Sequence, residues 1–147
     1  MRRSDPLQAA IEALARSDQL TASLRQKLSL GGYGEVEIES TLTQLSEWGL
    51  LNDLSLSEHW AQRASEHPSK GRLRIAEELV RRGVDESLAE TLANAVLSDD
   101  DERARAQAML EERFADRKNP AKAARLLAGR GFDPELIQSL IEDFFGL

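Results

Sequence analysis

The sequence predicts an all-α protein made of three tandem three-helix bundles. The chain is rich in Ala, Leu, Glu and Arg but only 5% aromatic, which favours helices over strands. No segment sustains the alternation of apolar and polar residues that a half-buried strand needs. A pattern centred on glycine recurs after 51 and then 48 residues, a spacing typical of helical repeats.

The repeated pattern has the form of a glycine-ended helix. Leu79 lies four residues before Gly83 and Val84 follows it, which are the positions of a Schellman ending with its apolar contact. Glycine suits such an ending because the backbone there takes a positive φ that a β-carbon disfavours. The other two occurrences are Leu28, Gly32 and Tyr33, and Leu127, Gly131 and Phe132.

The first predicted repeat covers residues 1–51. It holds a helix from Pro6 to Ala15, a helix that ends at Gly32, and a helix that runs toward Trp48 and ends at Gly49. The apolar stripe of the third helix is Val36, Ile38, Leu42 and Leu45.

The second predicted repeat covers residues 52–98. A helix over roughly 55–64 is followed by a helix that ends at Gly83 and by one that Asp85 caps. On a helical wheel the middle helix has one apolar arc, made of Leu73, Ile75, Ala76, Leu79 and Val80. The last helix bears Leu88, Leu92 and Val96.

The third predicted repeat covers residues 99–147. A helix over roughly 102–114 precedes two helices that each start with a capping residue and a proline, Asn119-Pro120 and Asp133-Pro134. The last of them bears Leu136, Ile137, Leu140 and Ile141. A repeat of about 48 residues is small for an isolated core, so we expect neighbouring repeats to pack on each other.

Composition excludes several classes of protein. With 41% hydrophobic and 31% charged residues the chain is globular, and without cysteine it has no disulfide, thiolate metal site or cysteine nucleophile. Acidic residues interrupt the N-terminal region where a signal peptide would need an apolar run, and no window is apolar enough to span a membrane. We therefore expect a cytoplasmic protein.

Charge is distributed in blocks although the net charge is −7. Residues 63–82 carry six basic and three acidic groups, residues 83–102 none and seven, and residues 103–130 eight and three. In the segment "SKGRLRIAEELVRRG", residues 69–83, the spacing predicts the ion pairs Glu77–Arg81 and Glu78–Arg82, worth about 0.2–0.5 kcal/mol each. Lys70, Arg72 and Arg74 have fewer acidic neighbours, so they are expected to be spare.

Four segments together resemble the RecX family of bacterial RecA regulators. They are "LTQLSEWGLLND" at 42–53, "HWAQRA" at 59–64, "KGRLRIAEELVRRGV" at 70–84 and "ARLLAGRGFDPELIQSLI" at 124–141, and the similarity spans about residues 18–145. The chain departs from the family pattern after residue 51, where Asn52-Asp53 stands for two aspartates and Leu56-Ser57 for an aromatic–alanine pair. It is also acidic, whereas many relatives are basic.

The resemblance implies an elongated and curved array of the three repeats that acts as a non-enzymatic regulator without cofactor. We expect this protein to be a monomer. Such a protein binds RecA and its filament on DNA and modulates recombinase, ATPase and SOS-inducing activity in recombination and repair. We expect it to inhibit these activities, although the residues themselves do not say whether the filament is inhibited or stabilised. The cations expected to meet the filament or exposed phosphate lie in the two basic blocks. They are Lys70, Arg72, Arg74, Arg81, Arg82, Arg117, Lys118, Lys122, Arg125 and Arg130.

Two other functions stay open. One is a helix-turn-helix-like DNA reader, although the second helices begin "GEVEIES", "DESLAET" and "DPELIQS", acidic where phosphate would lie. The other is a helical adaptor for an unrelated protein.

Other chemistry has less support. His59 and His67 lack the spacing of a metal site, and Ser98 before "DDDE" is typical of a helix cap rather than of a calcium loop. The sequence contains no phosphate loop and no nucleophile motif, so no catalytic residue is expected. Trp48 and Trp60 are expected in the core rather than stacked on bases.

Overall fold

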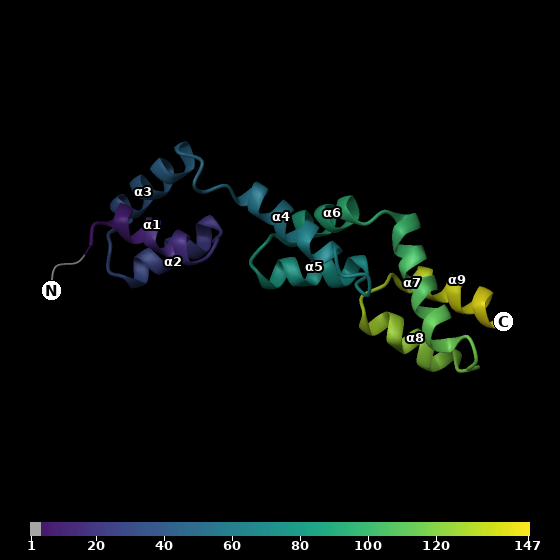
Figure 1. Ribbon diagram of the computed structural model, residues 1–147. Coiled ribbons are helices and arrows are strands. Elements are labelled where there is room, and N and C mark those ends of the chain that lie inside the picture. The colour runs from purple at the N-terminus through teal and green to yellow at the C-terminus, as the bar shows by residue number, and fades with distance from the viewer. Residues whose placement is uncertain (1–3) are drawn as a thin grey trace. The chain divides into compact units, whose positions relative to one another are not determined.

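The computed structural model describes residues 4–147, and this part of the chain is all α, with nine helices and no strand (Figure 1). The predicted fold class is therefore confirmed. The helices of the first predicted repeat are α1 (Pro6–Arg16), α2 (Thr21–Leu30) and α3 (Glu35–Glu47). The second has α4 (Asp53–Ser65), α5 (Arg72–Arg81) and α6 (Glu86–Val96). The third has α7 (Asp99–Phe114), α8 (Pro120–Gly129) and α9 (Pro134–Phe145).

Packing groups the helices into two units, one that runs to Leu56 and one over Ser57–Leu147. In the first unit α1, α2 and α3 pack on one another. In the second unit α5 packs on α6, while α9 packs on both α7 and α8. The division into repeats over 1–51, 52–98 and 99–147 stays a prediction, and these three segments keep the names first, second and third repeat below.

The three glycine-ended helices have the predicted geometry. The backbone φ is +88° at Gly32, +101° at Gly83 and +80° at Gly131. In each turn the amide after the glycine donates to the carbonyl five residues earlier: Tyr33 to Leu28 at 3.2 Å, Val84 to Leu79 at 3.0 Å and Phe132 to Leu127 at 3.2 Å. This is the long hydrogen bond of a Schellman ending, and the apolar residues that flank each glycine are largely buried.

Side-chain caps start the helices at the predicted residues. The Asp85 carboxylate accepts from the amides of Ser87 and Leu88, and the Asn119 side chain accepts from that of Lys122 at 3.1 Å. Ser98 accepts from Asp101 at 3.1 Å, so the acidic run after it forms the first turn of α7, where negative charge suits the helix dipole. The cap on α9 is Asp133, which accepts from Leu136 at 3.2 Å.

Each repeat buries its own apolar residues. In the first repeat the core includes Leu24, Leu28, Ile38, Leu42 and Leu45. The second repeat buries Ala61, Ile75, Leu79, Val84, Ala89 and Leu97. In the third the core includes Ala106, Leu110, Phe114, Leu127, Phe132 and Leu140.

Several residues expected in the core lie outside it. Val36 is 84% exposed because the core contact of α3 begins at Ile38, and Trp48, at the end of that helix, is 53% exposed. On α5 the predicted apolar arc is wider than the surface that covers it. Ile75 and Leu79 are buried, whereas Leu73 is 52% and Val80 43% exposed.

None of the described helices combines the length and apolar character that a membrane crossing requires.

Candidate partner-binding surface

The first turn of α5 is completed by the third repeat. The amide of Gly71 donates to the carbonyl of Arg130 at 2.9 Å, and that of Leu73 to the carbonyl of Gly131 at 2.9 Å. Between them the amide of Arg72 donates to Glu102 Oε2 at 2.7 Å. The N-terminal amides of a helix lack acceptors within the helix. For α5 the acceptors are the two carbonyls after α8 and the side chain of Glu102.

Glycine is required on both sides of this contact. A β-carbon on Gly71 would lie 2.4 Å from the carbonyl oxygen of Gly131, and one on Gly131 would lie 2.3 Å from the amide nitrogen of Arg74. Both neighbours are backbone atoms, which cannot move aside as a flexible side chain would. The glycine in "KGR" thus allows two backbones to approach each other.

The buried carboxyl of Glu102 and the half-buried side chain of Arg72 lie at this junction. Glu102 is only 2% exposed, and burial raises the pKa of its carboxyl, although the amide and the charge of Arg72 act in the opposite direction. The guanidinium of Arg72 turns toward the start of α7, where Nε donates to the carbonyl of Leu97 and Nη1 to Asp99 Oδ1, both at 2.5 Å. Arg72 was expected to be spare; it holds the second and third repeats together.

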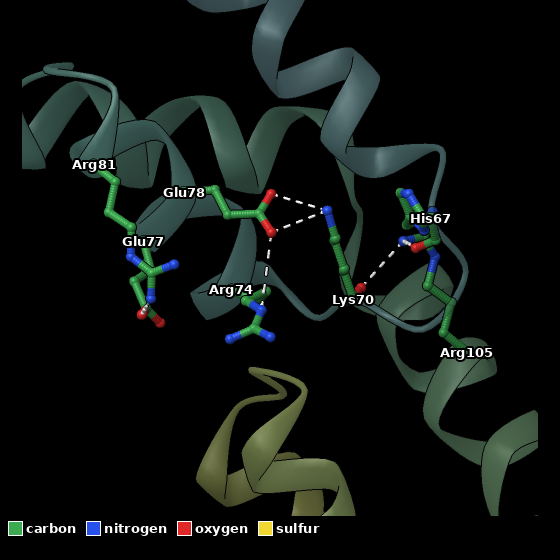
Figure 2. Close-up of polar contacts among 7 residues, drawn as sticks. All are labelled: His67, Lys70, Arg74, Glu77, Glu78, Arg81 and Arg105. Atoms are coloured by element: carbon green, nitrogen blue, oxygen red, sulfur yellow. Dashed lines mark hydrogen bonds and ion pairs between the residues drawn. The ribbon is translucent and has the colours of Figure 1, made fainter.

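A second arginine ties α7 to the loop before α5. Arg105 Nη1 donates to the carbonyls of His67 at 2.9 Å and Lys70 at 3.1 Å (Figure 2). Its Nη2 donates to the carbonyl of Ser65. One planar guanidinium therefore satisfies three carbonyls at the end of α4 and in the loop that follows. His67 takes part through its backbone, and no group of three metal-ligating side chains occurs within residues 4–147.

Glu78 forms ion pairs with the other two cations that were expected to be spare. Figure 2 shows its carboxylate between Lys70, whose Nζ lies 3.0 Å from both oxygens, and Arg74, whose Nε lies 3.9 Å from Oε1. The predicted pair Glu77–Arg81 is present. The predicted partner of Glu78, Arg82, instead places its guanidinium 4.8 Å from the ring centroid of Trp60.

The cations of the third repeat differ from those of the second. Arg117, Lys118, Lys122 and Arg125 are exposed and Arg130 is half-buried. None of the five has an ion pair with a residue of the described range. Arg117 and Lys122 line a hollow together with Arg113, Phe114 and Leu126. We name the cations Arg113, Arg117, Lys118, Lys122 and Arg125 the third-repeat basic surface.

Sequence reasoning missed three residues of the junction and of the basic surface, Arg113, Glu102 and Arg105, and it gave Glu78 the wrong partner. Arg113 lies one helical turn before Arg117, and that spacing could have grouped the two. Glu102 lies four residues before the core residue Ala106, which places it on the buried face of α7. Arg105 has its partners 35 to 40 residues away, so no local signal pointed to them. The pair of Glu78 with Arg74 has the i, i+4 spacing and could have been predicted, whereas the pair with Lys70 could not.

Comparison with known proteins gives concordant matches. A family model described as "RecX, second three-helix domain" matches residues 52–92. The chain is 31% identical over 137 residues to a protein named "Regulatory protein RecX" from Neisseria meningitidis serogroup A, covering 90% of this chain and 86% of that one. Proteins of the same name from Trichlorobacter lovleyi and Halorhodospira halophila are 30% and 34% identical, covering 95% and 89% of this chain and 95% and 83% of theirs.

The fold also matches a solved structure. The crystal structure of RecX from Lactobacillus salivarius superposes with a TM-score of 0.80, covering 97% of this chain and 96% of that one at 20% sequence identity. At this identity the match concerns the fold.

Proposed function

The chain belongs to the RecX family of regulatory proteins, and we propose that it binds RecA and the RecA filament on DNA and inhibits the recombinase, ATPase and SOS-inducing activities of that filament. The proposal includes a non-catalytic role, which the name of the relatives, "Regulatory protein RecX", supports. Membership of the family and the names of the relatives support the choice of partner.

The observation that carries the proposal is the third-repeat basic surface. Its exposed cations lack carboxylate partners among the described residues, so their charge is available to a partner. A partner with acidic side chains or exposed phosphates complements such a surface and is steered toward it. A RecA–DNA filament offers both kinds of group.

Of the ten cations expected to bind, those of the third repeat are the stronger candidates. Lys70, Arg72, Arg74 and Arg81 already have carboxylate partners, and Arg82 stacks on Trp60. A partner that recruited them would first have to break these contacts. We therefore propose that Arg117, Lys118, Lys122 and Arg125, together with Arg113, meet the filament first.

A groove-reading DNA-binding protein is a weaker alternative. The helices that follow the three Schellman turns carry acidic residues in their first turns, at Glu35, Glu86 and Glu135. Carboxylates at these positions would repel phosphates at the place where a recognition helix enters the groove.

The test is the rate of ATP hydrolysis by RecA on single-stranded DNA as the protein is added. Wild-type protein should lower the rate, and Lys122→Glu with Arg125→Glu should weaken this effect. The matched control reverses two exposed cations of the first repeat, Arg16→Glu with Lys27→Glu, and should keep the effect. An unchanged rate at every ratio of wild-type protein to RecA would refute the proposal.

Binding to DNA without RecA distinguishes the DNA-binding alternative from the proposed function. If the protein contacts several phosphates directly, the logarithm of its binding constant falls with the logarithm of salt concentration, at a slope near −0.9 per phosphate. We expect weak binding to naked DNA compared with binding to the filament.

A further inference from the structure

A groove between α5 and α6 has an apolar floor and an acidic rim. Its volume is about 560 Å³, and the two helices that form it lie side by side in the second repeat (Figure 1). The floor includes Leu73, Ala76 and Val80 of α5. These residues are spaced i, i+3 and i+7, so they form one stripe of about 10 Å along the helix.

The stripe is apolar surface that the fold leaves open. Leu73 is 52% and Val80 43% exposed, although Ile75 and Leu79 of the same helix are buried. An exposed apolar stripe inside a hollow with polar residues around it suits a partner helix that carries apolar side chains.

The rim is acidic and partly unneutralised. Glu77, Glu86, Glu90 and Asp133 line it, together with Arg72, whose guanidinium already donates to Leu97 and Asp99. Glu77 pairs with Arg81, and Asp133 caps α9, but Glu86 and Glu90 have no ion pair among residues 4–147. Because they lie four residues apart on α6 with the same charge, they repel each other. A cation between them would relieve this repulsion.

We propose that this groove binds a cationic amphipathic helix of a protein partner. The apolar side of that helix would lie on Leu73, Ala76 and Val80, and its lysines or arginines would meet Glu86 and Glu90. Helix-in-groove binding of this kind reads anchors at i, i+3 or i+4, and i+7, which is the spacing of the floor itself. The carboxylates of the rim disfavour a phosphate-bearing ligand. The groove has no residue in common with the third-repeat basic surface, so the inference does not depend on the function proposed above.

The test uses a designed probe, a fluorescein-labelled 18-residue peptide in which leucines at helical spacing alternate with lysines. Fluorescence anisotropy at 0.15 M salt measures its binding to the full chain. A peptide with the same leucines and glutamates in place of lysines, and one with the same lysines and alanines in place of leucines, are the comparison probes. The cationic amphipathic peptide should bind at least about tenfold more tightly than either.

Two variants locate the site. Leu73→Ala with Val80→Ala removes the floor without a change of charge, and Glu86→Lys with Glu90→Lys reverses the rim. Each should weaken binding about tenfold, equivalent to about 1.4 kcal/mol. The matched controls are Leu30→Ala with Val36→Ala, which lie exposed in the first repeat, and Glu111→Lys with Glu112→Lys, which lie exposed on α7. Both controls should bind as the wild type does.

The named positions are exposed on helices, so the variants should keep the helical circular dichroism spectrum, which is recorded first. Amide chemical shifts of the labelled protein should change along α5 and α6 when the peptide is added. Equal loss of binding in the rim variant and its charge-matched control would overturn the proposal, because it would show attraction to net charge only. Equal binding of the acidic peptide, or shift changes confined to other helices, would also overturn it. So would self-association of the protein that Leu73→Ala with Val80→Ala abolishes, because the occupant would then be a second copy of the chain.

Discussion

The carbonyl oxygen of Gly131 lies 2.4 Å from the position that a β-carbon would take on Gly71. The same carbonyl accepts the amide of Leu73 at 2.9 Å, so the two glycines lie where the second and third repeats are hydrogen-bonded backbone to backbone. This contact leads to the first prediction.

Alanine at either glycine should destabilise the second unit. Gly71→Ala places a methyl group against backbone, and Gly131→Ala adds the strain of a side chain at φ +80°. Each change should lower the free energy of unfolding by about 2 kcal/mol or more, in the upper part of the range for point mutations. Urea unfolding followed by circular dichroism measures the loss.

The control for this experiment is Gly129, two residues before Gly131. A β-carbon on Gly129 would meet open space, and this glycine lies at the end of α8 without a positive φ. Gly129→Ala should leave stability unchanged or raise it by up to about 1 kcal/mol. If Gly71→Ala were as harmless as Gly129→Ala, the close approach of the two backbones would be wrong.

The second prediction concerns the pH dependence of stability at Glu102. Burial raises the pKa of this carboxyl in the folded protein above its ordinary value of 4.5, and the charges of Asp133 and Asp99 add to the rise. The folded state therefore binds the proton more tightly than the unfolded state does. The contribution to stability is fully present below the ordinary pKa and is lost as the pH rises through the raised pKa.

Glu102→Gln removes this titration but keeps an oxygen that can accept the amide of Arg72. The free energy of unfolding of the wild type should therefore fall relative to that of Glu102→Gln as the pH rises above 4.5 and through the raised pKa. Glu102→Leu, which has no acceptor, should be less stable than Glu102→Gln by about 1–3 kcal/mol. A difference between wild type and Glu102→Gln that stays constant with pH would contradict the expected direction.

The third prediction separates two arginines on α7. Arg105→Ala removes the donors to three backbone carbonyls, so it should destabilise the protein by about 1–3 kcal/mol. Arg103→Ala, two residues earlier, removes only an exposed pair with Asp143 at 3.2 Å, and should change stability by less than about 1 kcal/mol. Thermal unfolding of the two variants side by side makes the comparison. Equal losses would show that the carbonyl contacts of Arg105 contribute little.

The fourth prediction distinguishes structural cations from binding cations. Arg72→Ala loses hydrogen bonds to Leu97 and Asp99 at the junction and should lower the free energy of unfolding by about 1–3 kcal/mol. Lys122→Ala, on the third-repeat basic surface, should leave it unchanged within about 0.5 kcal/mol. At a temperature where both are folded, only Lys122→Ala should weaken the effect on RecA.

If Arg72→Ala kept full stability and lost the effect on RecA, Arg72 would be a partner-binding residue and not a structural one. Measuring unfolding before activity keeps the two readings apart, because a loss of effect in an unfolded sample says nothing of contact.

Local features of the fold could be predicted from the sequence. Helix ends at Gly32, Gly83 and Gly131 depend on residues within one turn, and so do the caps at Asp85, Asn119 and Asp133. Such signals need no knowledge of distant parts of the chain, which explains why both sets are present as predicted.

The junction could not be predicted in the same way. Lys70 lies before the start of α5 and pairs with Glu78 eight residues later, a spacing that no regular helix surface suggests. Arg72 reaches residues 25 to 30 positions away. The wheel of α5 grouped Leu73 and Val80 with Ile75 and Leu79, but it could not show how much of that arc a neighbouring helix covers.

The amides at the start of α5 find their carbonyl partners about 60 residues further along the chain. During synthesis at 5–20 residues per second, the ribosome needs roughly 3–12 s to make the intervening segment. Until α8 has emerged, we expect the amides of Gly71 and Leu73 in the nascent second repeat to bond to water instead. A chaperone or protease that acts on newly made chains would meet this region during that interval, and premature termination after α6 would leave it in that condition permanently.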